Sequence, residues 1–260
     1  LLSEGVAPNA VVAFTFTRLL VGFFTLSIFP AARGPVRRED RAGIFWVGVL
    51  WMAFPLSMFP FAEQHITSAM TGMLNGANPL FVVIVAALLA RSMPSRSVVI
   101  GLVVGMAGAA MIAWPGLGEG SNSVLGIGLV MAALVSYGVA LNLARPLQQR
   151  NGGLPVIWRA LGVALILTAP LGLPELLAAR WTLRSALSML ALGSMGTATA
   201  QVLMARAAGR FGASTASGST FLIPVVALAL GVIVRGERVA AVSVIGGAVC
   251  LAGAWLISRK

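Results

Sequence analysis

One apolar pattern occurs twice in this chain, at a constant offset of 145 residues. The segment VIGLVVGMAGAAMI at 99–112 aligns with VIGGAVCLAGAWLI at 244–257, and 8 of the 14 positions are identical. Continued upstream, the same register places Pro79 on Pro224, and each proline lies inside a long apolar run. Duplicated apolar segments that are interrupted by proline are typical of secondary transporters, whose substrate sites form at the repeat interface.

Composition favours a membrane protein. The chain is 58% hydrophobic and 10% charged, whereas a soluble domain has roughly 25% charged residues. We therefore expect lipid to solvate much of its surface. The net charge of +11 does not indicate a nucleic-acid partner, because the basic residues lie in short gaps between apolar runs rather than on one face. The single cysteine, Cys250, excludes an intramolecular disulfide.

Nine apolar runs have roughly the 20 residues that a helix needs to span a bilayer. They are 10–29, 43–61, 66–90, 97–114, 124–143, 155–173, 183–204, 213–234 and 239–257. Subtracting 145 from 124–143 gives a span that would end before residue 1. We therefore expect a first helix of ~20 residues to be missing from this chain, and a nine-helix protein is the alternative.

The predicted fold is an all-α integral membrane protein with two inverted five-helix repeats, at 1–115 and 116–260. The distribution of basic residues predicts the orientation, because cytoplasmic loops carry the excess of Lys and Arg. If the loop at 31–42 is cytoplasmic, the inner side holds 12 of these residues and the outer side 4. We therefore expect a multi-pass protein of the inner (plasma) membrane with a cytoplasmic C-terminus.

The most specific stretch lies at 190–257. It contains the glycine-rich segment LALGSMGTATAQVLMARAAGRFGAS, small residues that lead to Pro224, the pair Gly236-Glu237 and IGGAVCLAGAWLI. The first half follows this pattern more loosely, from Pro8 and Arg18 to Pro79 and 99–112.

With these motifs the sequence resembles the drug/metabolite transporter superfamily, specifically its EamA-type branch of ten-helix carriers. The resemblance covers nearly the whole chain but departs at Arg91-Ser92, which stand where the second half has Gly236-Glu237. It implies transport, more often export, of small polar metabolites such as amino acids. It also implies alternating access between two five-helix repeats.

Arg18 is the sharpest candidate for a substrate-binding residue. It follows Pro8 by ten residues, or ~15 Å along a helix axis, which places it near the middle of the membrane. An arginine there costs on the order of 2.5–3.5 kcal/mol and usually faces the bundle interior. Its planar guanidinium suits a substrate carboxylate or phosphate. The alternatives are a structural tie to backbone carbonyls and a side chain that reaches the interface.

The run at 66–90 carries polar residues at spacings of four, four and three, which would share one helical face: Thr67, Thr71, Asn75 and Asn78. Pro79 cannot donate a hydrogen bond to the Asn75 carbonyl, nor Pro224 to that of Thr220. Each repeat is thus expected to expose a backbone acceptor beside a polar side chain, which suits an amine or hydroxyl group. Hydrogen bonding between helices, with a kink that helps packing, is the alternative.

Three further patterns can be interpreted from sequence. Tyr137 and Gln201 are isolated polar groups in apolar runs and are candidates to line a cavity. Arg159 lies near the start of its run, from which its side chain can reach the interface. The small residues at 101, 105 and 108, and at 246, 250 and 253, indicate close helix packing rather than ligand binding.

The sequence contains no HExxH motif, no phosphate-binding glycine loop and too few acidic residues for a metal cluster. We therefore expect neither an enzyme nor a bound cofactor or metal.

The leading hypothesis is an ATP-independent exporter that binds its substrate at mid-membrane, with seven candidate residues: Arg18, Thr71, Asn75, Asn78, Tyr137, Gln201 and Thr220. The alternative is a non-transporting membrane interaction or assembly protein with the same fold. Coupling to a proton or counter-substrate, and a homodimer, remain open.

Overall fold

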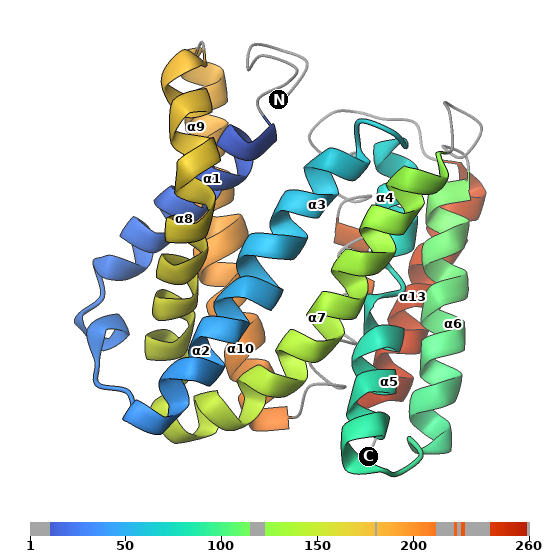
Figure 1. The fold of residues 1–260 in the computed structure, drawn as a ribbon. Coiled ribbons are helices and arrows are strands. Elements are labelled where there is room, and N and C mark those ends of the chain that lie inside the picture. The colour runs from blue at the N-terminus through green and yellow to red at the C-terminus, as the bar shows by residue number, and fades with distance from the viewer. Residues whose placement is uncertain are drawn as a thin grey trace. The chain divides into compact units, whose positions relative to one another are not determined.

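The computed structural model describes residues 11–114, 123–179, 181–211, 221–222, 225–226 and 240–258. Within these ranges the regular structure is helical and contains no strand, as an all-α membrane protein requires. The chain divides into two compact units, the first made of Leu1–Pro60 and Leu143–Arg210 and the second of Phe61–Asn142 and Phe211–Lys260. Each unit therefore combines a segment from each half of the sequence (Figure 1).

The first unit contains two single helices and two helical rods that each include a π-helical segment. The single helices are α1 (Val11–Ser27) and α8 (Gly153–Ala178). One rod consists of α2 (Arg41–Val47), η3 (Gly48–Ala53) and α3 (Phe54–Ala62), and the other of α9 (Leu183–Ala191), η5 (Leu192–Thr199) and α10 (Ala200–Phe211). The unit boundaries at Pro60 and Arg210 leave only the last residues of α3 and α10 in the second unit. Two short 3-10 turns, η1 (Pro30–Arg33) and η2 (Arg38–Asp40), lie between α1 and α2.

The helices of the second unit are α4 (Ser68–Asn75), α5 (Asn78–Ala90), α6 (Arg96–Ala113) and α13 (Ala241–Ser258), together with most of α7 (Val124–Asn151). Helix α7 is longer than the predicted run at 124–143. It continues through Pro146 into residues 143–151, which belong to the first unit. The predicted helix at 213–234 lies almost wholly outside the described residues.

Among the described residues, four helices are long and apolar enough to cross a membrane: Arg38–Ala62, Val124–Asn151, Gly153–Ala178 and Ser185–Met204. Four shorter apolar helices accompany them, namely Val12–Ser27, Asn78–Ala90, Arg96–Ile112 and Ala241–Ile257. These helices agree with the predicted multi-pass membrane protein.

Helices that are copies of each other in the repeat pack against each other in antiparallel directions. The offset of 145 places α1 on 156–172 of α8. The start of α1 meets the end of α8, where Gly172 packs on Phe16, and the end of α1 meets the start of α8, where Trp158 bonds to Ser27. Helices α6 and α13, which lie side by side (Figure 1), are related in the same way, because Gly101 near the start of α6 meets Gly253 near the end of α13, whereas Gly108 meets Gly246. Opposite directions of repeat copies confirm the predicted inverted repeat.

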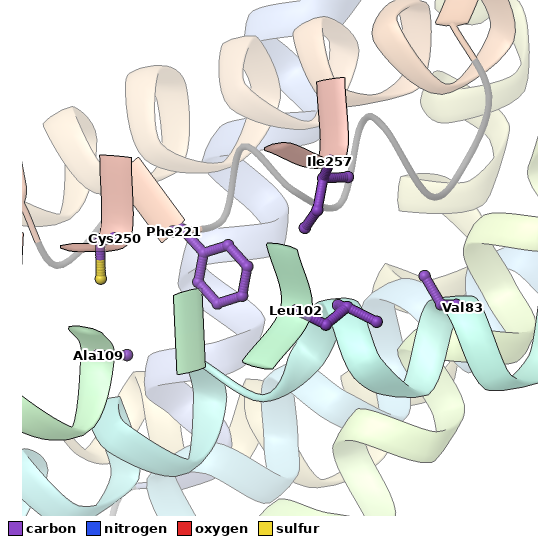
Figure 2. Packing of buried hydrophobic residues seen from close by; sticks show 6 residues of the cluster. All are labelled: Val83, Leu102, Ala109, Phe221, Cys250 and Ile257. Carbon is purple, nitrogen blue, oxygen red and sulfur yellow. The ribbon is translucent and has the colours of Figure 1, made fainter. Parts of the chain in front are cut away.

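Small residues bring α6 and α13 into close contact, as predicted. A Cβ added at Gly101 would lie 2.9 Å from the Gly253 carbonyl oxygen, and one added at Gly108 would lie 2.7 Å from that of Gly246. Figure 2 shows the buried cluster beside this contact, in which six side chains pack together: Val83, Leu102, Ala109, Phe221, Cys250 and Ile257. Glycine here serves the approach of two backbones rather than a ligand.

The structure breaks the apolar run at 66–90 into two helices at residues 76–77, beside the proline that the sequence places inside this run. Helix α4 ends at Asn75, and α5 starts at Asn78 with Pro79 in its first turn. The cause is Pro79, which has no N–H to donate to the Asn75 carbonyl. The polar residues that were expected to share one continuous helical face (Thr67, Thr71, Asn75 and Asn78) are therefore divided: Thr71 and Asn75 belong to α4, whereas Asn78 begins α5.

Candidate functional site

The polar contact of Arg18 lies in the first unit, between α1 and the π-helical segment η5. The Arg18 Nε donates a hydrogen bond of 2.6 Å to Oγ1 of Thr197, which is fully buried. One turn along α1, Gly22 permits a close approach, since a Cβ there would lie 3.3 Å from the Gly193 carbonyl oxygen. The half-buried guanidinium of Arg18 is thus held beside η5.

The π-helical backbone orients the hydroxyl group that Arg18 meets. The Thr197 hydroxyl donates to the carbonyl oxygen of Leu192, five residues earlier, at 3.2 Å. Because its proton is committed there, its lone pairs are left to accept from Arg18. Segments of π-helix are frequent at functional sites, and sequence inspection did not select Thr197.

Gln201 lies four residues after Thr197, in the first turn of α10, and is half-buried. Residues three or four apart share one side of a helical rod. Arg18 and Thr197 are thus in direct contact, and Gln201 is placed about one turn along the same rod. The spacing of Thr197 from Gln201 in the segment TATAQ is the sequence signal that could have identified Thr197.

The repeat provides an internal comparison for this polar group. The offset of 145 pairs each of these polar residues with an apolar residue of the other half: Arg18 with Val163, Thr197 with Met52 and Gln201 with Leu56. Val163 packs on Gly48 of η3, and both Met52 and Leu56 are buried. Apolar side chains therefore occupy the related positions, and the polar group is particular to this side of the repeat.

In the second unit, the polar residues at the α4–α5 break differ in their hydrogen bonding. The buried Thr71 hydroxyl donates within its own turn, to the Thr67 carbonyl oxygen at 3.1 Å. Asn75 is half-buried at the end of α4. Asn78 is only 7% exposed, and its Oδ1 has no hydrogen-bond partner among the described residues. A buried acceptor without a donor costs about 1–3 kcal/mol, which makes Asn78 the strongest candidate of this group.

The remaining predicted residues are placed as follows. Tyr137 is half-buried on α7, next to Gly138, whose added Cβ would lie 2.9 Å from the Phe81 carbonyl oxygen on α5. Asn142, which was not a candidate from sequence, lies about one turn after Gly138; it donates to the carbonyl oxygen of Val82 at 3.0 Å and so ties α7 to α5. Thr220 and Pro224 lie outside the described residues. Within the described ranges, no group of three His, Cys, Asp or Glu side chains could hold a metal ion.

Two polar contacts that sequence inspection did not predict fix α1. The buried Thr15 hydroxyl donates at 3.0 Å to the carbonyl oxygen of Leu56, which has no intrahelical donor because Pro60 stands four residues later. The Glu175 carboxylate accepts from the backbone N–H of Ala13 at 2.9 Å, at the positive end of the α1 dipole. Both contacts hold α1 in the position from which Arg18 reaches η5.

Comparison with known proteins agrees with this architecture. The EamA-like transporter family model matches residues 2–114 and 124–259. A probable terminal-alkyne amino-acid exporter of Streptantibioticus cattleyicolor is 27% identical over 98% of this chain and 86% of its own. An uncharacterized transporter of Bacillus subtilis, YdfC, is 25% identical over 96% of this chain and 81% of its own.

A solved crystal structure shares the fold, with a TM-score of 0.76 at 19% identity over 97% of this chain and 88% of that one. The names of the relatives indicate a transporter rather than an enzyme. Together with the apolar helices and the inverted repeat, these matches show that the chain belongs to the EamA-like transporter family of multi-pass membrane proteins.

Proposed function

We propose that this protein is a secondary, ATP-independent transporter that exports a small metabolite bearing a carboxylate, such as an amino acid or a related compound. Arg18 carries the proposal. It places a permanent positive charge in an apolar helix, beside a buried hydroxyl, at a position where the related half of the molecule has Val163. A guanidinium held in this way binds a carboxylate through two parallel hydrogen bonds.

The relative from Streptantibioticus cattleyicolor supports this substrate class, since that protein is named a probable amino-acid exporter. In the second unit, we propose that Asn78 accepts a hydrogen bond from an amine or hydroxyl group of the substrate. The unpartnered Oδ1 supports that role. The two residues are independent candidates, and each is to be tested by its own variant.

Counterflow in proteoliposomes tests the proposal. Three matched compounds are compared: an amino acid, the amine that lacks its carboxylate and the carboxylic acid that lacks its amine. We expect the amino acid to be carried best and the amine to be carried least, because the amine leaves Arg18 without its anion. If none of a broad panel of metabolites is carried, the alternative of a non-transporting membrane interaction protein replaces this proposal.

We further propose that the protein lies in the inner membrane with its C-terminus in the cytoplasm, with repeats at 1–115 and 116–260. The excess of arginine on the side of the 31–42 loop supports this orientation. Energy would come from the gradient of a substrate or ion. Fusions to the C-terminus test the orientation, because green fluorescent protein reports a cytoplasmic end and alkaline phosphatase an external one.

A further inference from the structure

A cavity of about 520 Å³ opens in the first unit between α1, α2, α8 and the loop before α2. Two arginines line it: Arg41, the first residue of α2, and Arg159, in the second turn of α8. The rest of its wall is mainly aromatic and aliphatic, and includes Phe23, Phe45, Trp158 and Ile166. This cavity is separate from the contact of Arg18 with Thr197.

Neutral groups hold Arg159 in place. Its Nη2 donates to the Gly34 carbonyl oxygen at 2.9 Å and its Nη1 to that of Pro155 at 3.2 Å. Its guanidinium carbon lies 5.5 Å from the centre of the Trp158 ring, which also stacks on Phe23. None of these contacts neutralises the positive charge, although the side chain is fixed.

The acidic residues near the cavity are committed to other partners. The Asp40 carboxylate, 3% exposed, pairs with Arg150 at 2.8 Å and accepts from Asn151 at 2.7 Å. Glu39 pairs with Arg37 at 3.5 Å on the surface. No carboxylate lines the cavity, and among the described residues neither Arg41 nor Arg159 has an ion-pair partner. The cavity therefore presents two cationic side chains and no carboxylate, a charge pattern that suits an anion.

The surroundings favour an anion that carries acyl chains. Phe45 and Ile166, on the cavity wall, are 43% and 73% exposed, so their apolar side chains face lipid in a membrane protein. Arg159 lies six residues from the start of α8, or ~9 Å along its axis, near headgroup depth. Trp46 on α2 is 52% exposed, and tryptophan is enriched at this level.

We propose that this cavity binds an anionic phospholipid, with the phosphate between Arg41 and Arg159 and an acyl chain over Phe45 and Ile166. Basic residues beside a membrane-spanning helix are a common basis for binding anionic lipids. This site does not depend on the proposed substrate or on transport.

Lipid binding to the delipidated protein tests the site. Native mass spectrometry and thermal melting compare phosphatidylglycerol with phosphatidylcholine of identical acyl chains. We expect wild type to retain and be stabilised by phosphatidylglycerol, and Arg41→Gln to bind it about five-fold more weakly, as a contact of about 1 kcal/mol implies. Arg38→Gln removes an exposed arginine of the same loop that does not line the cavity, and should bind like wild type.

Arg159→Gln should weaken binding further. If that variant does not fold, because it loses its bonds to Gly34 and Pro155, Arg41→Gln decides the outcome. Equal binding by wild type and Arg41→Gln, an equal loss in Arg38→Gln, or equal retention of phosphatidylcholine would each overturn the site. Displacement of the lipid by millimolar glycerol 3-phosphate would also overturn it, since the cavity would then bind a soluble anion.

Discussion

The Sγ of Cys250 lies 3.5 Å from the carbonyl oxygen of Gly105, the residue 145 positions earlier and its own copy in the repeat. A residue that contacts its own copy lies next to the two-fold axis that relates the copies. In the second unit this axis therefore passes between α6 and α13 at Cys250 and Gly105. The antiparallel course of the two helices follows from it.

Close packing around this axis predicts which glycines are indispensable. A Cβ at Gly253 would collide with the backbone of Gly105 and lie 2.8 Å from the Gly101 carbonyl oxygen. We expect Gly253→Ala to lower the free energy of unfolding by about 1–3 kcal/mol, the usual cost of overpacking. Gly128→Ala is the matched control, because a Cβ there meets nothing within 4 Å. Equal melting temperatures for the two variants in detergent would contradict this interpretation.

The Thr15 hydroxyl is expected to stabilise α1 because Pro60 leaves the Leu56 carbonyl without a donor. Thr15→Val should cost about 1 kcal/mol of stability. In a Pro60→Ala background, the new N–H can bond to Leu56, so the same substitution should cost less. Chemical denaturation of the four proteins in a double-mutant cycle measures this coupling. An equal cost in both backgrounds would exclude it.

Arg91 ends α5 in the left-handed conformation, with φ 49° and ψ 38°. The Ser92 N–H bonds to the Ala87 carbonyl and the Arg91 N–H to that of Leu88, as in a Schellman motif. A side chain in this conformation costs roughly 1–2 kcal/mol, and the repeat has Gly236 at the related position. We expect Arg91→Gly to raise the melting temperature and Arg91→Ala not to. A similar gain from both would assign the effect to charge.

The sequence was sufficient to predict the fold class and the inverted repeat. Apolar runs of spanning length and a constant offset are properties of the chain itself, and they persist as α6 packed on α13 and α1 packed on α8. The close approach at Gly101 and Gly253 was predictable for the same reason, because small residues recur at equal spacing in both copies.

The site was less predictable, because its contacts join distant parts of the chain. Arg18 stood out as a charge in an apolar run, but its partner Thr197 is 179 residues away and depends on π-helical geometry. The polar stripe failed for a local reason: spacing alone assumes an unbroken helix, and Pro79 interrupts it. Among these polar residues, Asn78 is the one whose buried side-chain oxygen has no hydrogen-bond partner in the described part of the chain. Sequence could not identify it, because burial is determined by tertiary packing.

Transport by Arg18→Val tests the central claim most directly. Valine is the residue at the related position, Val163, so the variant should keep the packing of the first unit and melt near wild type. Loss of a charge-assisted contact of about 1.5–3 kcal/mol predicts a fall of at least ten-fold in amino-acid counterflow. A folded Arg18→Val protein that transports the amino acid at the wild-type rate would contradict the account.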